Sequence, residues 1–238
     1  MEIKDIFGIS ISSAALCFSI YATIYSNRKA KENKQRTVRE LFTNILDKLV
    51  SLQLDTIKIK NEHQHDAKFI YDLNGLIRQK QGFLLEEATY LARQIPKLIQ
   101  SYEYNTLATN HGDIGNKEEA EEFYKLAIDK SKHDRERGIT TSSYAVLLFQ
   151  TDRQPEARDT FKKSIDLITL NDDISKQIRG NIYRMWATSE FDFAQSTSLA
   201  NNILIKAANE YSAINIDSVK KERLVSLAAL HQIINASS

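Results

Sequence analysis

Paired acidic side chains are the groups in this sequence that could move protons. Adjacent pairs in or near expected turns are Glu118 with Glu119, Glu121 with Glu122, and Asp172 with Asp173. Each pair lies in a polar turn or in the first turn of an expected helix, where negative charge interacts favourably with the helix dipole. The flanking sequence shows no sign of the burial that would raise a carboxyl pKa. The pairs are therefore expected to stabilise helix starts, not to act as a general acid and base.

Histidine is the other side chain here that could bind a metal ion or transfer a proton. His63 and His65 lie in the polar stretch EHQHD, and a spacing of two residues directs them to different sides of a helix. A solvated turn is therefore expected at residues 62–66. None of the five histidines has an arginine four to seven residues upstream, which argues against a helical ribonuclease of the Arg-x-His type.

The short motifs of common enzymes do not occur in the sequence. The 7 glycines form no phosphate-binding loop, and neither Gly-x-Ser-x-Gly nor His-Glu-x-x-His is found. The sequence therefore predicts a protein that is not an enzyme and that has no catalytic residue, metal ion or cofactor. An enzyme with an unrecognised site is the less favoured alternative.

Composition limits the class of protein. The 32 Lys and Arg residues nearly balance the 31 Asp and Glu residues, so the basic excess typical of nucleic-acid binding is absent. The single cysteine, Cys17, excludes an intrachain disulfide and a multi-cysteine zinc site. Helix-forming residues are abundant, and only 7 Gly and 2 Pro interrupt them. The expected fold class is all-α.

The stretch from Ile6 to Asn27 contains no charged residue. At a rise of about 1.5 Å per residue, a helix of this length reaches roughly 33 Å, enough for a hydrocarbon core of about 30 Å. A cleaved signal peptide is less favoured, because the preceding MEIKD is charge-balanced and a basic cluster follows the stretch. The sequence predicts a single transmembrane helix at residues 6–27, after a short non-cytoplasmic end at residues 1–5.

A basic cluster directly follows this stretch and indicates its orientation. Its members are Arg28, Lys29, Lys31, Lys34, Arg36 and Arg39. Because basic flanks stay in the cytoplasm, the chain is expected to be a single-pass protein of the cell (inner or plasma) membrane with its N-terminus outside. The cluster is expected to contact anionic lipid headgroups. A solvated helix face is the alternative.

Small residues form a stripe along the predicted span. They are Gly8, Ser12, Ala15, Ser19, Ala22 and Ser26, at alternating spacings of four and three. Such a stripe lets membrane helices approach closely, so it predicts helix packing and a possible homo-oligomer. A chance pattern in a span rich in serine and alanine is the alternative.

Residues 28–65 are expected to form a basic juxtamembrane segment followed by an amphipathic helix. This helix carries a second stripe, with heptad spacing. Its members are Val38, Phe42, Ile45, Leu49, Leu52, Thr56 and Ile59. The stripe suits either a coiled coil or packing on the chain's own helical domain. The additional apolar residues Leu41, Leu46 and Val50 widen it and favour packing on the domain.

Two segments near the middle of the chain repeat each other. Residues 115–129, GNKEEAEEFYKLAID, match residues 152–166, DRQPEARDTFKKSID, at an offset of thirty-seven. Ala120 then pairs with Ala157, and Tyr124 pairs with Phe161. Two copies of a helical hairpin explain this match, and a stable array needs further hairpins on both sides.

These residues resemble the tetratricopeptide repeat family. The residues of the first copy that match its pattern are Leu107, Ala108, Gly115, Ala120, Tyr124 and Ala127. The second copy matches less well, and its residues are Tyr144, Ala145, Ala157, Phe161 and Ser164. It is also about three residues longer than the usual repeat. The resemblance implies an array of α-hairpins at residues 66–238, although other hairpin arrays satisfy the same pattern.

The resemblance also implies a partner-binding groove along the first helix of each hairpin. Its expected residues are Asn105, Thr109, Asp113, Ser142, Val146 and Gln150. These side chains are polar or small enough to meet a peptide, although simple exposure to solvent explains them equally well.

The leading functional prediction is a membrane-anchored scaffold whose cytoplasmic helical domain recruits an unidentified protein or peptide partner to the lipid bilayer. The alternative is an oligomerising membrane effector or signal transducer, controlled by its cytoplasmic helical sensor domain. No nucleic-acid partner is expected.

Overall fold

The computed structural model describes the backbone of residues 3–62 and 66–236, and the side chains of residues 22–60, 62, 66 and 68–236. Within these ranges the chain forms nine helices and no strand, which confirms the all-α prediction. The helices are α1 (Ile3–Glu62), α2 (Ala67–Gln94), α3 (Ser101–Ile114), α4 (Lys117–Lys130), α5 (Asp134–Gln150), α6 (Gln154–Asp166), α7 (Asp173–Asp192), α8 (Thr197–Ser212) and α9 (Asp217–Ala236).

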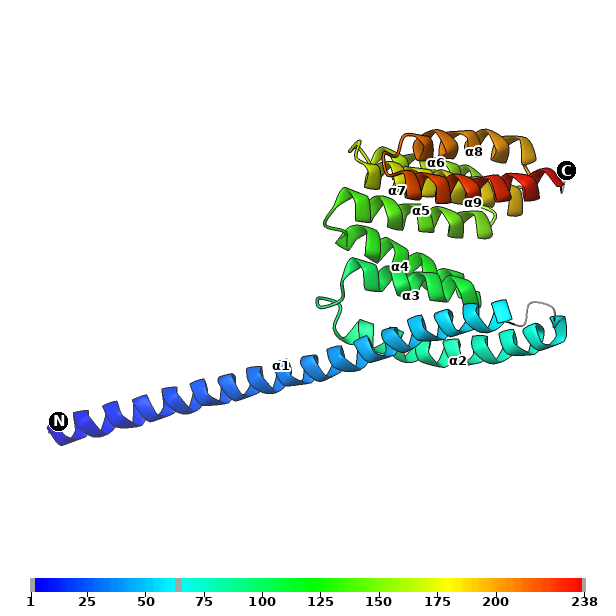
Figure 1. The fold of residues 1–238 in the computed structure, drawn as a ribbon. Coiled ribbons are helices and arrows are strands. Elements are labelled where there is room, and N and C mark those ends of the chain that lie inside the picture. The colour runs from blue at the N-terminus through cyan, green and yellow to red at the C-terminus, as the bar shows by residue number, and fades with distance from the viewer. Residues whose placement is uncertain (1–2, 63–65, 237–238) are drawn as a thin grey trace.

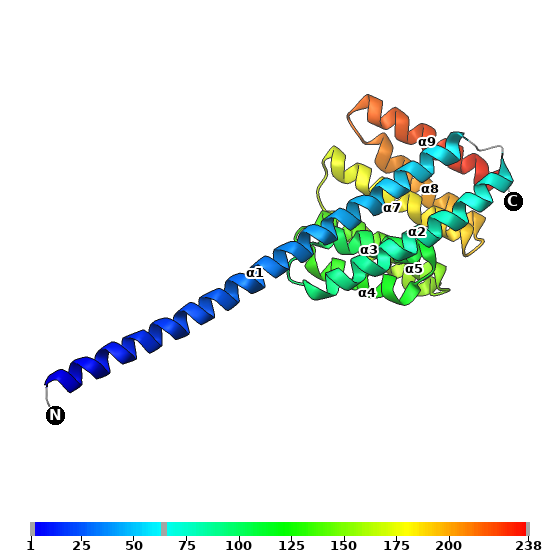
Figure 2. The ribbon, with the colours of Figure 1, turned by 90° about the horizontal axis from the view of Figure 1, so that it is seen from below.

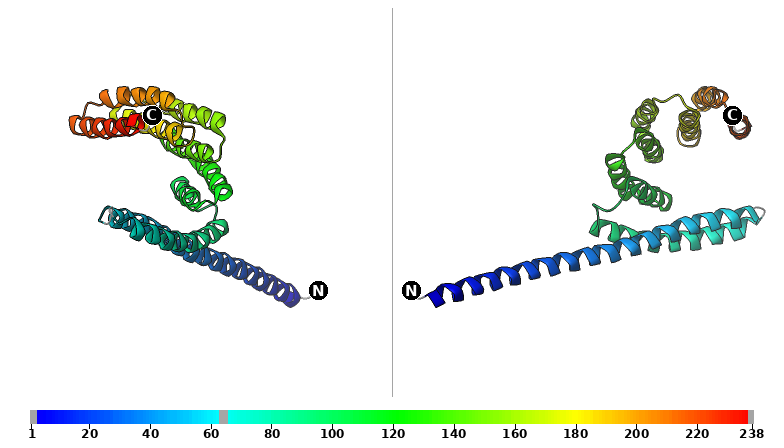
Figure 3. Two further views of the ribbon diagram at one scale, coloured as in Figure 1. Left: turned by 90° about the vertical axis from the view of Figure 1, so that its right-hand side faces the viewer. Right: turned by 60° about the vertical axis from the view of Figure 1, so that its left-hand side comes forward.

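The helices form a stack of antiparallel hairpins. The second half of α1 pairs with α2, whereas its first half projects away from the other helices (Figure 1). Seen from below, α1 and α2 lie side by side in front of the remaining helices (Figure 2). The hairpins α3–α4, α5–α6 and α7–α8 follow, and α9 packs on α8. Figure 3 shows that the stack curves, with the α1–α2 hairpin at one end of the arc and α7 to α9 at the other.

The predicted transmembrane helix is the main correction to the expected fold. In the part of the chain that the structure describes, no helix is long and apolar enough to cross a membrane. Residues 6–27 instead belong to the 60-residue helix α1, which continues without a break through the basic cluster. The described side chains between Ala22 and Arg36 are nearly all exposed, and most are polar or charged. A chain anchored in the cell membrane by a single span is therefore not the fold observed, and the predicted localisation is wrong.

The small-residue stripe of the expected span lies mostly beyond what the structure describes. Gly8, Ser12, Ala15 and Ser19 lie outside the residues whose side chains the structure describes. His63 and His65, in the expected solvated turn, also lie outside the described residues. Ala22 and Ser26 are exposed on the projecting part of α1. The self-association predicted for this stripe therefore stays a prediction.

The heptad stripe of α1 packs on the chain's own domain. Phe42 and Leu49 are fully buried, and Ile45 joins them in the same core cluster. The favoured interpretation of this stripe, packing on the chain's own domain, is thus confirmed. The widening residues divide, because Leu46 is buried whereas Leu41 and Val50 are exposed.

The repeated positions lie at equivalent places in two hairpins. Ala120 and Ala157 are fully buried where α4 and α6 cross their partner helices, because an alanine lets two helix backbones approach closely. Tyr124 and Phe161, four residues later, lie on the same faces and are also buried. Gly115 ends α3 with a φ of 97°, a left-handed conformation that glycine adopts at little cost. The internal repeat therefore reflects the same helix packing in two hairpins.

Candidate functional site

The inner face of the stack contains a small cavity between α3, α5 and α7. Its volume is about 160 Å³, and four of the six predicted groove residues line it: Thr109, Asp113, Val146 and Gln150. Residues three or four positions apart share one face of a helix, so one turn of α3 and one turn of α5 each supply two of them. The other lining residues are Gly112 of α3, Tyr124 of α4, Ser143 and Leu147 of α5, and Met185 of α7. Four of the six residues that the resemblance implied therefore line one hollow together.

The other two predicted groove residues lie elsewhere. Ser142 is 1% exposed, and its hydroxyl donates to the backbone oxygen of Ile139 at 2.7 Å, so the prediction that it faces a partner is wrong. Its neighbour Ser143 lines the cavity instead. Asn105 is half-buried and does not line the cavity. The buried Oδ1 of Asn105 has no hydrogen-bond partner among the described atoms.

A larger hollow of about 450 Å³ adjoins this cavity, and Asp113 lines both. It lies where the second half of α1 and the middle of α2 face the end of α3. Its lining residues are Leu52, Gln53, Thr56, Ile57, Lys60, Asn74, Ile77, Arg78, Gln81 and Asp113. We call the two adjoining hollows together the concave groove. Only Asp113 of the larger hollow was expected to line a groove, because the repeat pattern does not extend to α1 and α2.

Amide side chains form a fixed part of the groove wall. Gln53 of α1 and Gln81 of α2 both donate to Oδ1 of Asn110, at 3.2 and 2.9 Å. Asn110 is buried on α3 and donates its own amide to the backbone oxygen of Thr106 at 2.8 Å. Asn110 therefore joins three helices at the base of the groove and holds the two glutamine side chains in place.

Charges of both signs lie along the concave groove. Lys60 and Arg78 line the hollow between α1 and α2, and Asp113 lies where the two hollows meet. Desolvation raises the pKa of the Asp113 carboxyl, and the nearby ammonium group of Lys117 opposes this effect. Lys117 also donates to the side chain of Gln150 at 2.7 Å, which fixes one end of the smaller cavity.

The basic cluster expected to meet lipid headgroups divides in the structure. Arg28, Lys29, Lys31 and Lys34 are exposed on the projecting part of α1. Arg39 instead donates to both carboxylate oxygens of the buried Glu103, at 2.7 and 2.6 Å. Arg36 pairs with Glu40 one turn later on the same helix. Arg39 thus ties α1 to α3.

The paired carboxylates take structural roles. Asp172 caps α7 by accepting from the backbone N–H of Ser175 at 2.9 Å, and Asp173 accepts from the backbone N–H of Asn215 at 3.1 Å. Glu122 pairs with Arg93. Within the described residues, no three His, Cys, Asp or Glu side chains come close enough together to hold a metal ion.

Glu121 of α4 makes the stability of the fold depend on pH in a way that can be tested. It accepts hydrogen bonds from the Tyr144 hydroxyl at 2.8 Å and from Arg153 at 2.7 Å, and it pairs with Lys125. Burial alone would raise the pKa of Glu121, but these partners together lower it from 4.5 to about 2. The interaction therefore stabilises the fold above pH 4.5, and this stabilisation is lost as the pH falls toward about 2.

We expect Glu121→Gln to lower the free energy of unfolding at pH 7 by on the order of 2 kcal/mol. Urea denaturation of both proteins at pH 7, 4 and 3 should show this difference shrinking as the pH falls. Glu122→Gln, at the half-exposed pair with Arg93, is the matched control and should change the free energy by less than about 1 kcal/mol. A difference that stays constant from pH 7 to pH 3 would contradict the assignment.

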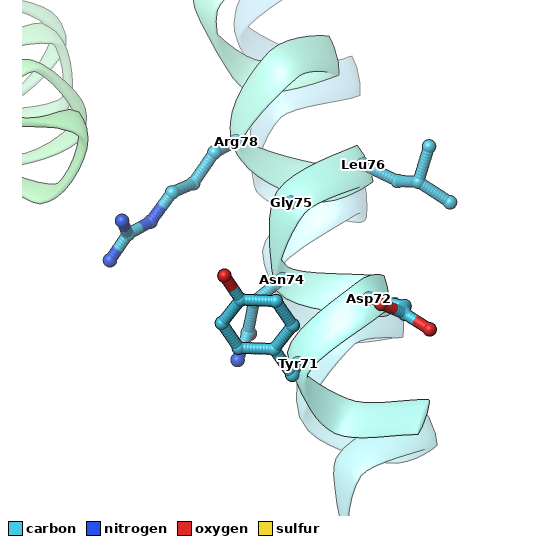
Figure 4. Close-up of a pocket in the computed structure, with 6 residues that line it drawn as sticks. All are labelled: Tyr71, Asp72, Asn74, Gly75, Leu76 and Arg78. Atoms are coloured by element: carbon cyan, nitrogen blue, oxygen red, sulfur yellow. The ribbon is translucent and has the colours of Figure 1, made fainter. Parts of the chain in front are cut away.

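A further hollow of about 620 Å³ lies along α2 alone. All six of its lining residues come from two turns of this helix: Tyr71, Asp72, Asn74, Gly75, Leu76 and Arg78. In Figure 4 Arg78 and Tyr71 point to one side of the helix, and Leu76 and Asp72 point to the other. One helix cannot enclose a ligand, so this hollow is open surface and not a binding site.

No family model, curated protein or solved structure matches the chain. The resemblance to tetratricopeptide repeats is therefore not supported, and the assignment to that family is wrong. The residues that suggested it serve packing: Ala108, Ala120 and Ala127 are fully buried in the α3–α4 hairpin. Any tightly crossed α-hairpin requires small residues at such positions, so the pattern does not distinguish this family from other stacked hairpins.

Proposed function

We propose that the protein is a helical adaptor that binds a peptide segment of a partner protein in the concave groove. The observation that carries this proposal is the meeting of two hollows at Asp113, which joins α1, α2, α3, α5 and α7 in one concave surface. A curved stack of hairpins suits this task because it offers an extended surface along its inner side.

The chemistry of the groove wall supports a peptide as the ligand. Amide side chains such as Gln53 and Gln81 both donate and accept hydrogen bonds, as the backbone of an extended peptide does. Apolar side chains also line the groove, including Ile57 and Ile77 in the larger hollow and Val146 in the smaller cavity. The smaller cavity of about 160 Å³ is of a size to receive one apolar side chain of the peptide.

Charge gives the proposed peptide a direction. Lys60 and Arg78 line the hollow between α1 and α2. We infer that the bound segment places an acidic side chain there and an apolar side chain in the smaller cavity, beside Val146 and Met185. The partner is thus defined by its chemistry as a protein with an exposed acidic–apolar segment.

Val146→Arg should abolish selection of peptides by the purified protein. The arginine would fill the smaller cavity and place a positive charge among Leu147, Met185 and Tyr124. We expect wild type to enrich acidic–apolar sequences from a displayed random-peptide library, and the affinity of the best peptide to fall at least about tenfold in the variant. Binding would be measured by fluorescence anisotropy.

Ile205→Arg is the matched control, because Ile205 is 60% exposed on α8 and lines no part of the groove. It should leave the affinity unchanged, and circular dichroism should show that both variants are folded. Arg78→Glu should reverse the preference for acidic peptides. Failure of wild type to enrich any sequence, or equal binding by wild type and Val146→Arg, would refute the proposed function.

A further inference from the structure

A row of exposed apolar side chains runs along the outer side of α2. Leu76, Phe83 and Tyr90 are 67%, 66% and 68% exposed. They follow one another at intervals of seven residues, which keeps them on one face of the helix. We name these three residues the α2 stripe. We propose that the α2 stripe joins two copies of this chain by antiparallel pairing of their α2 helices.

The stripe is separate from the concave groove. The α2 residues of the groove, such as Asn74 and Gln81, lie on the opposite side of the helix from Phe83 by the helical repeat. Figure 2 shows α1 and α2 in front of the other helices, and the high exposure of Leu76, Phe83 and Tyr90 shows that the rest of the described chain leaves the stripe largely uncovered. Three large apolar side chains in line on a helix, exposed to water, are typical of a helix-pairing surface.

The stripe is symmetric about Phe83. Leu76 lies seven residues before it, and Tyr90 lies seven residues after it. A two-fold axis at Phe83 therefore packs the two Phe83 side chains together and sets Leu76 of each copy against Tyr90 of the other. A self-complementary surface of this kind is what a two-fold dimer requires.

Flanking charges select the antiparallel orientation. Lys80 and Glu87 lie on one flank of the stripe, because they are seven residues apart, and Glu86 lies on the other. Antiparallel pairing brings Lys80 of each copy beside Glu87 of the other, which is attractive. Parallel pairing would bring Glu87 of one copy beside Glu86 of the other, which is repulsive.

This complementarity identifies the occupant as a second copy of the chain. An unrelated helix could cover Phe83, but it need not carry a glutamate opposite Lys80 and a lysine opposite Glu87. The α2 helix supplies both from one sequence. This proposal stands independently of the proposed function, since the groove and the stripe lie on opposite sides of α2.

Phe83→Glu should convert the dimer to a monomer. The change places two carboxylates against each other at the centre of the interface, and we expect dimer dissociation to become at least about a hundredfold more favourable. Sedimentation equilibrium of the full chain over a range of concentrations should show twice the chain mass of 27.2 kDa for wild type and the chain mass for the variant. Tyr71→Glu is the matched control, because Tyr71 is 79% exposed on another face of α2.

Cysteine crosslinking tests the orientation. In a Cys17→Ser background, Leu76→Cys and Tyr90→Cys chains should form a disulfide with each other when mixed, and neither should crosslink with itself. Self-crosslinking of each variant alone would show a parallel pair and overturn the proposal. A monomeric wild type at all concentrations, or unchanged association of Phe83→Glu, would overturn it as well. Glu87→Lys should weaken the dimer, and adding Lys80→Glu should restore it.

Discussion

Arg158→Met is expected to lower the free energy of unfolding by about 3–5 kcal/mol, because it leaves a buried carboxylate without its counter-charge. Glu190 of α7 is 0% exposed. Arg158 of α6 donates to both of its carboxylate oxygens at 2.7 Å, and the Trp186 indole N–H donates to one of them at 2.9 Å. Methionine retains the apolar stem of the arginine and removes the guanidinium, so the change isolates the electrostatic loss.

Urea denaturation followed by circular dichroism measures this effect. The double variant Arg158→Met/Glu190→Gln should recover more than half of the loss, because a neutral amide needs no counter-charge and still accepts from Trp186. Arg93→Met is the matched control. It breaks an ion pair with Glu122 in which both side chains are about half exposed, and it should cost less than about 1 kcal/mol. A loss for Arg158→Met as small as that of Arg93→Met would contradict the buried-charge argument.

The same type of contact joins other pairs of helices in the stack. Arg39 binds Glu103 across α1 and α3, and Arg179 binds both carboxylate oxygens of Glu210 across α7 and α8. Each guanidinium meets its carboxylate with two parallel hydrogen bonds, a geometry that fixes the relative position of two helices. These bonds therefore fix α1 against α3 and α7 against α8.

The helical hairpins could be predicted from the sequence because their packing is local. The offset of thirty-seven residues aligned Ala120 with Ala157 and Tyr124 with Phe161, and all four are buried at equivalent crossings. The family resemblance implied Thr109 with Asp113, and Val146 with Gln150, as groove residues, and each pair lines the smaller cavity because residues four apart share one face of a helix. Spacing along one helix is enough to identify such a shared face.

Contacts between distant helices could not be predicted in this way. Arg39 and Glu103 are separated by 64 residues, and Arg158 and Glu190 by 32, so no spacing rule links them. Arg39 consequently looked like one member of a basic cluster. The larger hollow could not be predicted for the same reason, because Lys60 and Asn74 line one hollow with Asp113 only after the α1–α2 hairpin packs on α3.

The membrane prediction failed on a different point. It took the lack of charge in residues 6–27 as a sign of a separate spanning element. The structure instead continues one helix through residues 6–27 and the basic cluster to Glu62. A lack of charged residues in one segment does not by itself show where a helix packs. The packing of a helix depends on the side chains along its whole length. For α1, the buried side chains Phe42 and Leu49 belong to the later part of the same helix.

Phe161→Ala is expected to lower the free energy of unfolding by about 3–5 kcal/mol, because it opens a cavity in the middle of the stack. Phe161 of α6 is fully buried between Phe149 of α5, at a ring-centroid distance of 6.1 Å, and Trp186 of α7, at 5.5 Å and nearly parallel. These three rings connect consecutive hairpins, so the alanine removes contacts on both sides of α6 at once.

The single tryptophan of the chain makes this second effect easy to follow, because Trp186 stacks directly on Phe161. Fluorescence and circular dichroism should report one shared unfolding transition in wild type, and both transitions should move to lower urea in the variant. Phe193→Ala, at a side chain that is 39% exposed, is the matched control and should cost less than half as much. Equal losses for the two variants would show that the ring stack across α5, α6 and α7 adds nothing beyond ordinary partial burial. A loss confined to Phe161→Ala would show that the ring stack contributes to the stability with which the α5–α6 hairpin packs on α7.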